Sequence, residues 1–253
     1  THNLCQILKD LYGINLPYEN HFDILFYTSY GYKSYSSLFI KTTHKIPLIS
    51  IIHDLRHILF SNNSIYNVLD DLYTRVLVKN SDLVVVPSEF LKKICITHYR
   101  HQVNRIAVLY SIPDLFMNIP KTELSNFQSI RHKYNLPERP FIFYPSTIVA
   151  TKNHLRLIEA LKIIKEKTGP INLVLCGSIS DRTLYQTILK KVEIYGLSKH
   201  FFHLGFIADQ DKYELYKFAK ALVMPSINES FGLPIWEAFS LGCPVVASDT
   251  QDL

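Results

Sequence analysis

Few folds accommodate residues 225–249, PSINESFGLPIWEAFSLGCPVVASD. A short apolar run at residues 221–224 precedes this segment and indicates a buried parallel strand. After a polar loop, Pro234 suits the first turn of a helix and Gly242 suits its end. A second apolar strand follows at residues 244–247. This order predicts half of a doubly wound α/β domain, in which ligands bind at the carboxyl ends of the strands.

The rest of the chain alternates apolar strands with helical patterns, which predicts repeated strand–helix units. The other predicted strands are residues 22–29, 46–52, 83–86, 105–109, 141–144, 173–177 and 201–204. The predicted helices are residues 65–78, 89–99 with Ser88 as N-cap, 127–134, 152–164, 184–195, 213–219 and 234–241, with one more within residues 1–20.

Apolar spacing also predicts the inward face of three helices. These faces are Ile65, Val68, Leu69, Leu72 and Val76 in the first, Leu155, Ile158, Leu161 and Ile164 in the second, and Ile235, Ala238, Phe239 and Leu241 in the third.

Two glutamates, Glu229 and Glu237, flank the start of the helix that Pro234 opens. A carboxylate can accept hydrogen bonds from vicinal hydroxyls of a hexose or a ribose. Backbone N–H groups of Phe231, Gly232 and Leu233 at a helix N-terminus favour a phosphate or a sugar oxygen. Spacing alone leaves another interpretation open, in which the first glutamate is a solvated loop residue and the second interacts with the helix dipole.

The run ESFGLPIWEA at residues 229–238 resembles the signature of glycosyltransferase family 4, which comprises retaining enzymes of the GT-B fold. LGCPVVAS at residues 241–248 resembles the next element of that family. The resemblance implies an α/β GT-B fold with two Rossmann-like doubly wound domains facing a cleft. It implies a hexosyltransferase, of which a mannosyltransferase is one case, that moves a sugar from a UDP- or GDP-linked donor to an acceptor hydroxyl. Such reactions build polysaccharides, glycolipids or other glycoconjugates.

Other segments resemble the same family. His53, in His53-Asp54-Leu55, matches a histidine that meets the donor sugar, and Lys152 matches a lysine that binds phosphate. Ser146 stands where many members carry an arginine in the phosphate-binding loop. Taken alone, the histidine can be a core residue and the lysine a solvated one. The resemblance assigns catalytic roles to His53, Lys152 and Glu229, and it assigns substrate binding to Glu237, Phe231, Gly232, Leu233, Gly205, Phe206, Gly177 and Ser146.

Within this assignment Glu237 accepts from the ribose, and the turn at Gly205 and Phe206 lies beside the nucleotide base. Gly177 ends a strand at the ligand-facing edge of its sheet. The resemblance also implies an acceptor-side domain at residues 1–116, an interdomain connection at 117–138 and a nucleotide-sugar-binding domain at 139–253. Both domains are expected to be incomplete, the first at its start and the second at its end.

The composition excludes several classes of protein. The 253 residues carry a formal charge of +5 with a pI of about 8.9, which suits a phosphate-bearing ligand or an anionic membrane surface. No basic run is interleaved with aromatics, so nucleic-acid binding is not expected.

The four cysteines are far apart, which argues against disulfides and against a zinc site. Their spacing favours a reducing compartment, the cytoplasm, and peripheral membrane contact is left open. The sequence holds no His/Cys cluster, and no metal is expected.

Two alternatives to a transferase remain at this point. A GT-B sugar-nucleotide epimerase or hydrolase would need additional acid/base carboxylates, which the sequence does not indicate. A non-catalytic nucleotide-sugar-binding or scaffold protein is supported by Ser146 in place of the arginine. The presence of Glu229, Lys152 and His53 together argues against that second alternative.

Overall fold

The computed structural model describes residues 25–29, 47–59, 65–100, 105–110, 127–136, 138, 140–229 and 231–250. The chain packs as two compact units, unit 1 (Thr1–Tyr110) and unit 2 (Ser111–Leu253). The helix predicted within residues 1–20 lies outside the described residues. The predicted domain limits stay a prediction.

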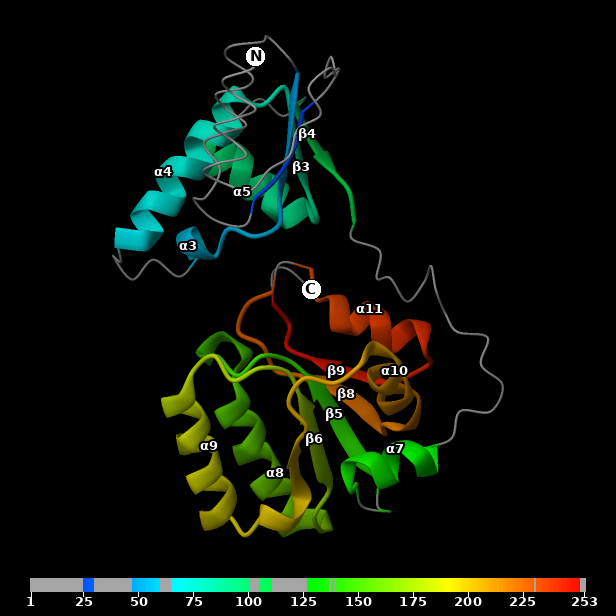
Figure 1. Ribbon diagram of the computed structural model, residues 1–253. Helices are drawn as coiled ribbons and strands as arrows, with labels where there is room; N and C mark the ends of the chain where they lie inside the picture. Colours follow the sequence, from blue (N-terminus) through cyan, green and yellow to red (C-terminus); the bar gives the residue numbers. More distant parts are fainter. Residues whose placement is uncertain are drawn as a thin grey trace, which may run out of the picture. The chain divides into compact units, whose positions relative to one another are not determined.

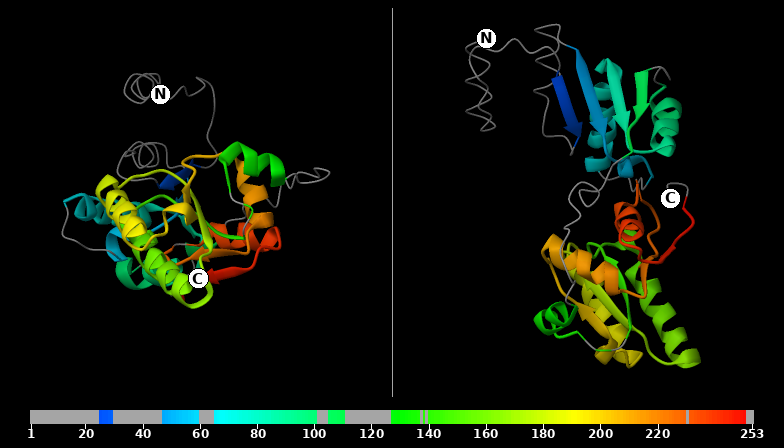
Figure 2. Two further views of the ribbon diagram at one scale, coloured as in Figure 1. Left: turned by 90° about the horizontal axis from the view of Figure 1, so that it is seen from below. Right: turned by 90° about the vertical axis from the view of Figure 1, so that its right-hand side faces the viewer.

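The described part of unit 1 contains a parallel sheet with the strand order β1-β2-β3-β4. Its elements are β1 (Leu25–Ser29), β2 (Leu48–Ile52), α3 (Arg56–Leu59), α4 (Ile65–Asn80), β3 (Leu83–Val86), α5 (Glu89–Tyr99) and β4 (Ile106–Val108). The strands lie side by side in the right-hand view of Figure 2. The strands predicted in this unit are confirmed, with shifts of one residue at some ends. Residues 22–24 and 46 of these predictions lie outside the described residues. Ser88 is the predicted N-cap of α5, and its hydroxyl accepts from the Leu91 N–H at 3.2 Å.

Helix α4 packs through a different face from the one that apolar spacing predicts. Its buried residues are Tyr73, Thr74, Leu77 and Val78. The predicted inward residues Ile65, Val68, Leu69, Leu72 and Val76 are instead 38 to 70% exposed. The prediction is wrong because this helix carries apolar residues on two sides, and spacing does not decide which side meets the sheet.

Unit 2 contains, within its described residues, a parallel sheet with the order β7-β6-β5-β8-β9. Its elements are α7 (Phe127–Tyr134), β5 (Phe141–Pro145), the 3-10 turn η2 (Ala150–Lys152), α8 (His154–Thr168), β6 (Asn172–Cys176), α9 (Arg182–Ile194), the 3-10 turn η3 (Ser198–His200), β7 (Phe201–His203), α10 (Asp209–Phe218), β8 (Ala221–Met224), α11 (Leu233–Ser240) and β9 (Val245–Ala247).

The sheet of unit 2 is covered by helices on both faces. Phe141 and Phe143 of β5 share a core with residues of α7, α10 and α11, whereas Ile142 and Tyr144 share one with α8 and α9. Figure 1 shows α8 and α9 on one side of this sheet and α10 and α11 on the other. Neighbouring residues of a strand point to opposite faces, so a strand buried on both faces must be apolar throughout. The predicted doubly wound α/β class is confirmed.

Two predicted inward residues of unit 2 are exposed. Phe239 of α11 is 57% exposed, because Ala238 occupies the buried position and the next residue lies about 100° around the helix. Ile164 of α8 is 37% exposed and lies at the margin of a stripe formed by Leu157, Ile158 and Leu161. Helix α7 has the predicted bounds and buries Ile130 in the core of unit 2, although it falls in the predicted interdomain connection.

Candidate functional site

Two loops meet at the carboxyl edge of the unit 2 sheet. Strands β5 and β8 are neighbours although β6 and β7 lie between them in sequence, so the strand order reverses between them. This is the topological switch point of a doubly wound sheet, outside which ligands bind. The loops that leave it are residues 146–153 after β5 and 225–232 after β8.

Two hydrogen bonds to backbone carbonyls tie these two loops together. The Ile227 N–H donates to the Thr151 carbonyl at 2.8 Å, and the Asn153 side-chain amide donates to the Pro225 carbonyl at 2.9 Å. Asn153 has a φ of 57°, a left-handed conformation that asparagine tolerates better than most residues. The two loops therefore form one connected surface.

A buried tyrosine supports the loops from below. The Tyr144 hydroxyl donates to the Lys152 carbonyl at 3.0 Å and lies 2.9 Å from the Ser226 hydroxyl. The tyrosine and the serine are fully buried. Burial raises the pKa of Tyr144 to about 12, so the phenol remains a donor at neutral pH. The backbone position of Lys152 is thus set by the core of the unit.

Two of the predicted catalytic residues are in contact. The Lys152 ammonium donates to a carboxylate oxygen of Glu229, and the exposed fractions of the two side chains are 25% and 11%. These residues come from the two loops at the switch point. A cation and a carboxylate side by side can bind the two parts of a ligand that carries both an anion and hydroxyls.

Glu237 is held between two donors on α10. The Lys212 ammonium donates to Oε1 at 3.0 Å, and the Tyr216 hydroxyl donates to Oε2 at 2.8 Å. Sequence reasoning did not identify these two donors. Their four-residue spacing places them on one face of α10, but nothing in the local sequence connects that face with Glu237.

The predicted residues Ser146, Gly177 and Gly205 lie beside one another at the ends of β5, β6 and β7. The Ser146 N–H donates to the Cys176 carbonyl, and the Gly177 N–H donates to the Gly205 carbonyl, each at 2.8 Å. Gly177 has a φ of +133°, and a Cβ built on it would lie 2.5 Å from the Ser146 carbonyl oxygen. Glycine is required at position 177 because neighbouring backbone occupies the side-chain position.

One aromatic residue of the predicted site is exposed, and the other, Phe231, is half-buried. Phe206 is 94% exposed. Phe231 stacks on Trp236 with ring centroids 5.7 Å apart and an angle of 14° between the rings.

Gly232 is the N-cap of α11 in a left-handed conformation, and Pro234 lies in the first turn as predicted. Leu233 is the first residue of the helix.

His154 falls in the first turn of the helix predicted at residues 152–164, and it is the first residue of α8. It is also buried, and its Nε2 lies 3.1 Å from the Ser146 hydroxyl. Its Nδ1 has no hydrogen-bond partner among the described residues. Burial, the nearby His203 and Lys152 lower the pKa of His154 to about 4, so the ring is neutral at pH 7.

This burial predicts a pH-dependent stability. The unfolded chain has a histidine pKa near 6.5, so between that value and about 4 it binds more protons at this position than the folded protein. The free energy of unfolding therefore keeps its full value, as far as His154 is concerned, above pH 6.5. It decreases as the pH falls towards 4. At about 1.36 kcal/mol per pKa unit, His154 contributes on the order of 3 kcal/mol to this loss. Urea unfolding at about pH 7.5 and about pH 5 should therefore show a smaller difference in His154→Phe than in the unsubstituted protein.

The matched control for this measurement is His132→Phe, which replaces an exposed histidine of α7. We expect this variant to keep the pH dependence of the unsubstituted protein. Equal pH dependence in His154→Phe and in the unsubstituted protein would contradict a buried neutral ring at this position.

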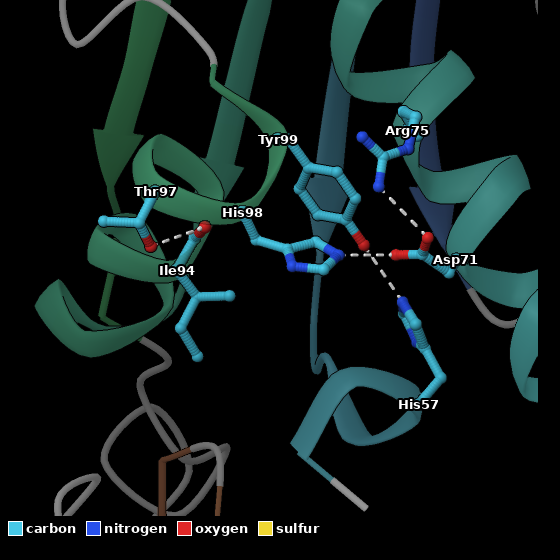
Figure 3. Close-up of polar contacts among 7 residues, drawn as sticks. All are labelled: His57, Asp71, Arg75, Ile94, Thr97, His98 and Tyr99. Atoms are coloured by element: carbon cyan, nitrogen blue, oxygen red, sulfur yellow. Dashed lines mark hydrogen bonds and ion pairs between the residues drawn. The ribbon is translucent and has the colours of Figure 1, made fainter. Parts of the chain in front are cut away.

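His53 belongs to unit 1, whereas the site residues described above belong to unit 2. It follows β2 directly and is half-buried at the carboxyl end of that strand, as predicted. The next helix, α3, is fixed by the Nε2 of His57, which lies 3.0 Å from the Tyr99 hydroxyl of α5 (Figure 3). The segment that carries His53 is therefore held to the body of its unit.

Asp71 of α4 contacts both His98 and Arg75 in Figure 3. His98 lies 2.9 Å from one carboxylate oxygen, and Arg75 donates to the other at 3.2 Å. Burial acts to raise the pKa of Asp71, but the hydrogen bonds from His98 and Arg75 outweigh it and lower the pKa. Arg75 also lies over the Tyr99 ring, 5.5 Å from its centroid. This cluster joins α4 to α5.

Neither a metal centre nor a membrane span is found in the part of the chain that the structure describes. No group of three or more His, Cys, Asp or Glu side chains there could hold a metal ion. No helix among these residues has the length and apolarity needed to cross a membrane. The expectation that no metal takes part stays a prediction.

Comparison with protein families gives two matches. The model of the family described as glycosyl transferases group 1 matches residues 126–252, about half of the chain. The model described as Glycosyltransferase Family 4 matches residues 11–115.

Individual relatives agree with these matches. The serotype-specific mannosyltransferase WbdA of Escherichia coli is 35% identical over 128 residues, which is 50% of this chain and 16% of that protein. The O-antigen chain mannosyltransferase B of Escherichia coli is 27% identical over 221 residues, which is 85% of this chain and 54% of that protein. The chain thus spans about half the length, or less, of these curated relatives.

A solved structure shows the same fold. The crystal structure of Alr3699/HepE from Anabaena in complex with UDP-glucose has a TM-score of 0.71 and 21% sequence identity. The match covers 90% of this chain and 60% of that one.

Proposed function

The chain belongs to the group 1 glycosyl transferases, and we propose that the protein transfers a hexose from a nucleotide-sugar donor to an acceptor hydroxyl with retention of anomeric configuration. The observation that carries the proposal is the Lys152–Glu229 pair at the switch point of the unit 2 sheet. It sets a phosphate-binding cation beside a hydroxyl-binding carboxylate where a doubly wound sheet binds its ligands. The fold alone would not decide function.

Each end of the donor is assigned to a different part of this surface. The diphosphate binds the Lys152 ammonium and the backbone N–H groups of Phe231, Gly232 and Leu233 at the start of α11. Glu229 accepts hydrogen bonds from the sugar hydroxyls. These assignments follow the geometry of the two loops and the motif in residues 229–238.

The nucleoside is assigned to the remaining predicted residues. Glu237 accepts from the ribose, and the turn at Gly205 and Phe206 lies beside the base. Ser146 and Gly177 form the tightly packed floor between them. HepE binds UDP-glucose and the Escherichia coli relatives are mannosyltransferases, so UDP- and GDP-linked hexoses are the donors to test.

During transfer the bond between the anomeric carbon and the diphosphate breaks, and a new bond forms to the acceptor oxygen. Negative charge develops on the leaving diphosphate, where Lys152 and the N-terminus of α11 stabilise it. The acceptor proton passes to a phosphate oxygen of the leaving group. We include His53 as the residue that unit 1 contributes at the donor sugar, on the basis of the H-D-L resemblance.

The acceptor is proposed to be a glycan, a lipid-linked saccharide or another hydroxyl compound, because the Escherichia coli O-antigen chain relative is a mannosyltransferase. A cytoplasmic location is part of the proposal. It is supported by Cys95, Cys176 and Cys243, which are buried free thiols. Peripheral membrane contact stays a prediction.

Calorimetric titration with UDP, GDP and ADP, followed by their glucose and mannose conjugates, tests the proposal. We expect one nucleoside diphosphate to bind and its sugar conjugate to be consumed only with an acceptor. The anomeric configuration of the product is read by NMR. Binding without any turnover would favour the non-catalytic alternative, and turnover of the donor alone would favour an epimerase or hydrolase.

Two isosteric variants distinguish the proposed role of Glu237 from that of Glu229. Glu237→Gln should weaken nucleoside diphosphate binding by about 10-fold or more, because a charged hydrogen-bond acceptor is worth about 1.5–3 kcal/mol. Glu229→Gln should leave nucleoside diphosphate binding unchanged or tighter, because it removes a carboxylate that competes for Lys152, yet it should abolish sugar transfer. Equal behaviour of the two variants towards the nucleoside diphosphate would refute the division of roles.

A further inference from the structure

The carboxylate of Glu237 is fixed by two side chains from the neighbouring helix. Lys212 and Tyr216 are one turn apart on α10, and each donates to a different carboxylate oxygen, at 3.0 and 2.8 Å. An ionised carboxylate offers about four acceptor positions on its two oxygens. Among the described residues, one donor on each oxygen leaves one position free on each, which matches a pair of vicinal hydroxyls.

The tyrosine cannot readily move away from this carboxylate. Tyr216 is fully buried, and its ring packs edge-on against Phe143 of β5 with ring centroids 5.0 Å apart and an interplanar angle of 83°. A buried phenolic hydroxyl requires an acceptor, and Glu237 supplies it. The rigid core of the sheet thereby sets the plane of the carboxylate.

The lysine adds charge from the more exposed side. Its side chain is 21% exposed, and its ammonium also contacts Asp209 at 3.2 Å. Burial acts to lower the pKa of Lys212, but Glu237 and Asp209 outweigh it and raise the pKa. Burial and Glu237 raise the pKa of Tyr216 well above its ordinary value. Both groups therefore keep their protons and remain donors at neutral pH.

We propose that Lys212 and Tyr216 are positioning residues that orient the Glu237 carboxylate so that its two remaining acceptor positions take the 2′- and 3′-hydroxyls of a ribose. The inference rests on the proposed function, because it assumes that Glu237 binds the nucleoside. A carboxylate oriented in advance binds hydroxyls without the entropic cost of ordering its own side chain. The pair thus makes the site selective for ribonucleotides over deoxyribonucleotides.

The test compares the dissociation constants of the nucleoside diphosphate that binds, UDP or GDP, and of its 2′-deoxy and 3′-deoxy forms. We expect the unsubstituted protein to favour the ribonucleotide by about 10-fold or more. The ratio of the dissociation constant of a deoxy form to that of the ribonucleotide should fall several-fold towards one in Tyr216→Phe and in Lys212→Met. Lys212→Arg, which keeps a donor and the charge, should restore part of the ratio.

Matched controls remove the same kinds of contact elsewhere on α10. Tyr134→Phe removes a tyrosine hydroxyl that donates to the Asp211 carboxylate, and Lys217→Met removes an ion pair with Glu214 at 3.1 Å. Both controls should keep the ribose ratio even where they lower the melting temperature. If Tyr216→Phe does not fold, the partly exposed Lys212 still provides the test.

The outcomes distinguish the inference from the function on which it rests. If the unsubstituted protein prefers the ribonucleotide and neither Tyr216→Phe nor Lys212→Met changes the ratio, the positioning role is wrong and the proposed function stands. If the unsubstituted protein binds all three nucleotides equally, the ribose role of Glu237 is wrong and the inference falls with it.

Discussion

Replacement of Lys152 by methionine is expected to weaken nucleoside diphosphate binding by about 10- to 100-fold and to abolish transfer. A hydrogen bond to a charged group is worth about 1.5–3 kcal/mol, and each 1.4 kcal/mol corresponds to about a tenfold change in affinity. Methionine keeps most of the apolar stem of the side chain and removes the ammonium. Calorimetry should show the loss for the diphosphate, whereas the weaker binding of the nucleoside alone should change little.

The same substitution also leaves Glu229 without its cation. That carboxylate is 11% exposed, and removal of one partner from a buried ion pair costs about 3–5 kcal/mol, a cost that partial exposure reduces here. A loss of binding could therefore follow from a loss of folding. The double variant Lys152→Met/Glu229→Gln separates the two effects, because it removes both charges and should recover much of the stability.

We expect this double variant to melt close to the unsubstituted protein and still to bind the nucleoside diphosphate weakly. The control for removal of a surface charge is Lys162→Met, which breaks an exposed ion pair with Glu166 on α8. That control should change neither binding nor stability appreciably. If Lys152→Met binds the nucleoside diphosphate as tightly as the unsubstituted protein does, the assignment of this lysine to the phosphate is wrong.

The Lys152–Glu229 contact could be predicted from the sequence only in part. The two residues are 77 positions apart, and the apolar runs before them predict that both follow parallel strands. Parallel strands of one sheet end at the same edge, so both residues were expected there. The contact itself depends on β5 pairing with β8 rather than only with β6, and local sequence patterns do not specify strand order.

The existence of a helix could be predicted from the sequence even in cases where its buried face could not. The apolar pattern in α7 predicted its bounds as the structure has them, because a polar segment surrounds it. In α4 the predicted face is the exposed one, and in α11 Phe239 lies outside the core. The spacing of apolar residues describes one helix at a time, whereas burial is decided by the element that packs against it.

The polar partners within the site were the least predictable part. Glu237 was identified from the motif, but Lys212 and Tyr216 lie on another helix in a segment without a motif. His154 was identified as a first-turn residue, but its burial against Ser146 could not be inferred. In both cases a side chain from a neighbouring element satisfies a buried polar group, and this requirement becomes visible only in three dimensions.

Gly177→Ala is expected to lower both stability and nucleotide affinity strongly. The new Cβ would lie 2.5 Å from the oxygen and 2.7 Å from the carbon of the Ser146 carbonyl, at a φ of +133° that residues with side chains rarely adopt. Backbone strain of about 1–3 kcal/mol and overpacking of about 1–3 kcal/mol add to a loss of about 2–6 kcal/mol in the free energy of unfolding. At about 2–4 °C per kcal/mol, the melting temperature should fall by roughly 4–24 °C.

Gly205→Ala is the matched control, because its φ of +68° is also positive but nothing lies within 4 Å of a Cβ at that position. It should cost only the intrinsic strain of a left-handed residue, about 1–2 kcal/mol. The difference between the two variants therefore isolates the packing of Ser146 on Gly177. Because this packing holds the start of the loop after β5, which carries Lys152, Gly177→Ala should also weaken nucleoside diphosphate binding more than Gly205→Ala. Equal melting temperatures and equal affinities in the two variants would mean that the Ser146 backbone can shift freely, and the loop after β5 would then not be the rigid half of the site.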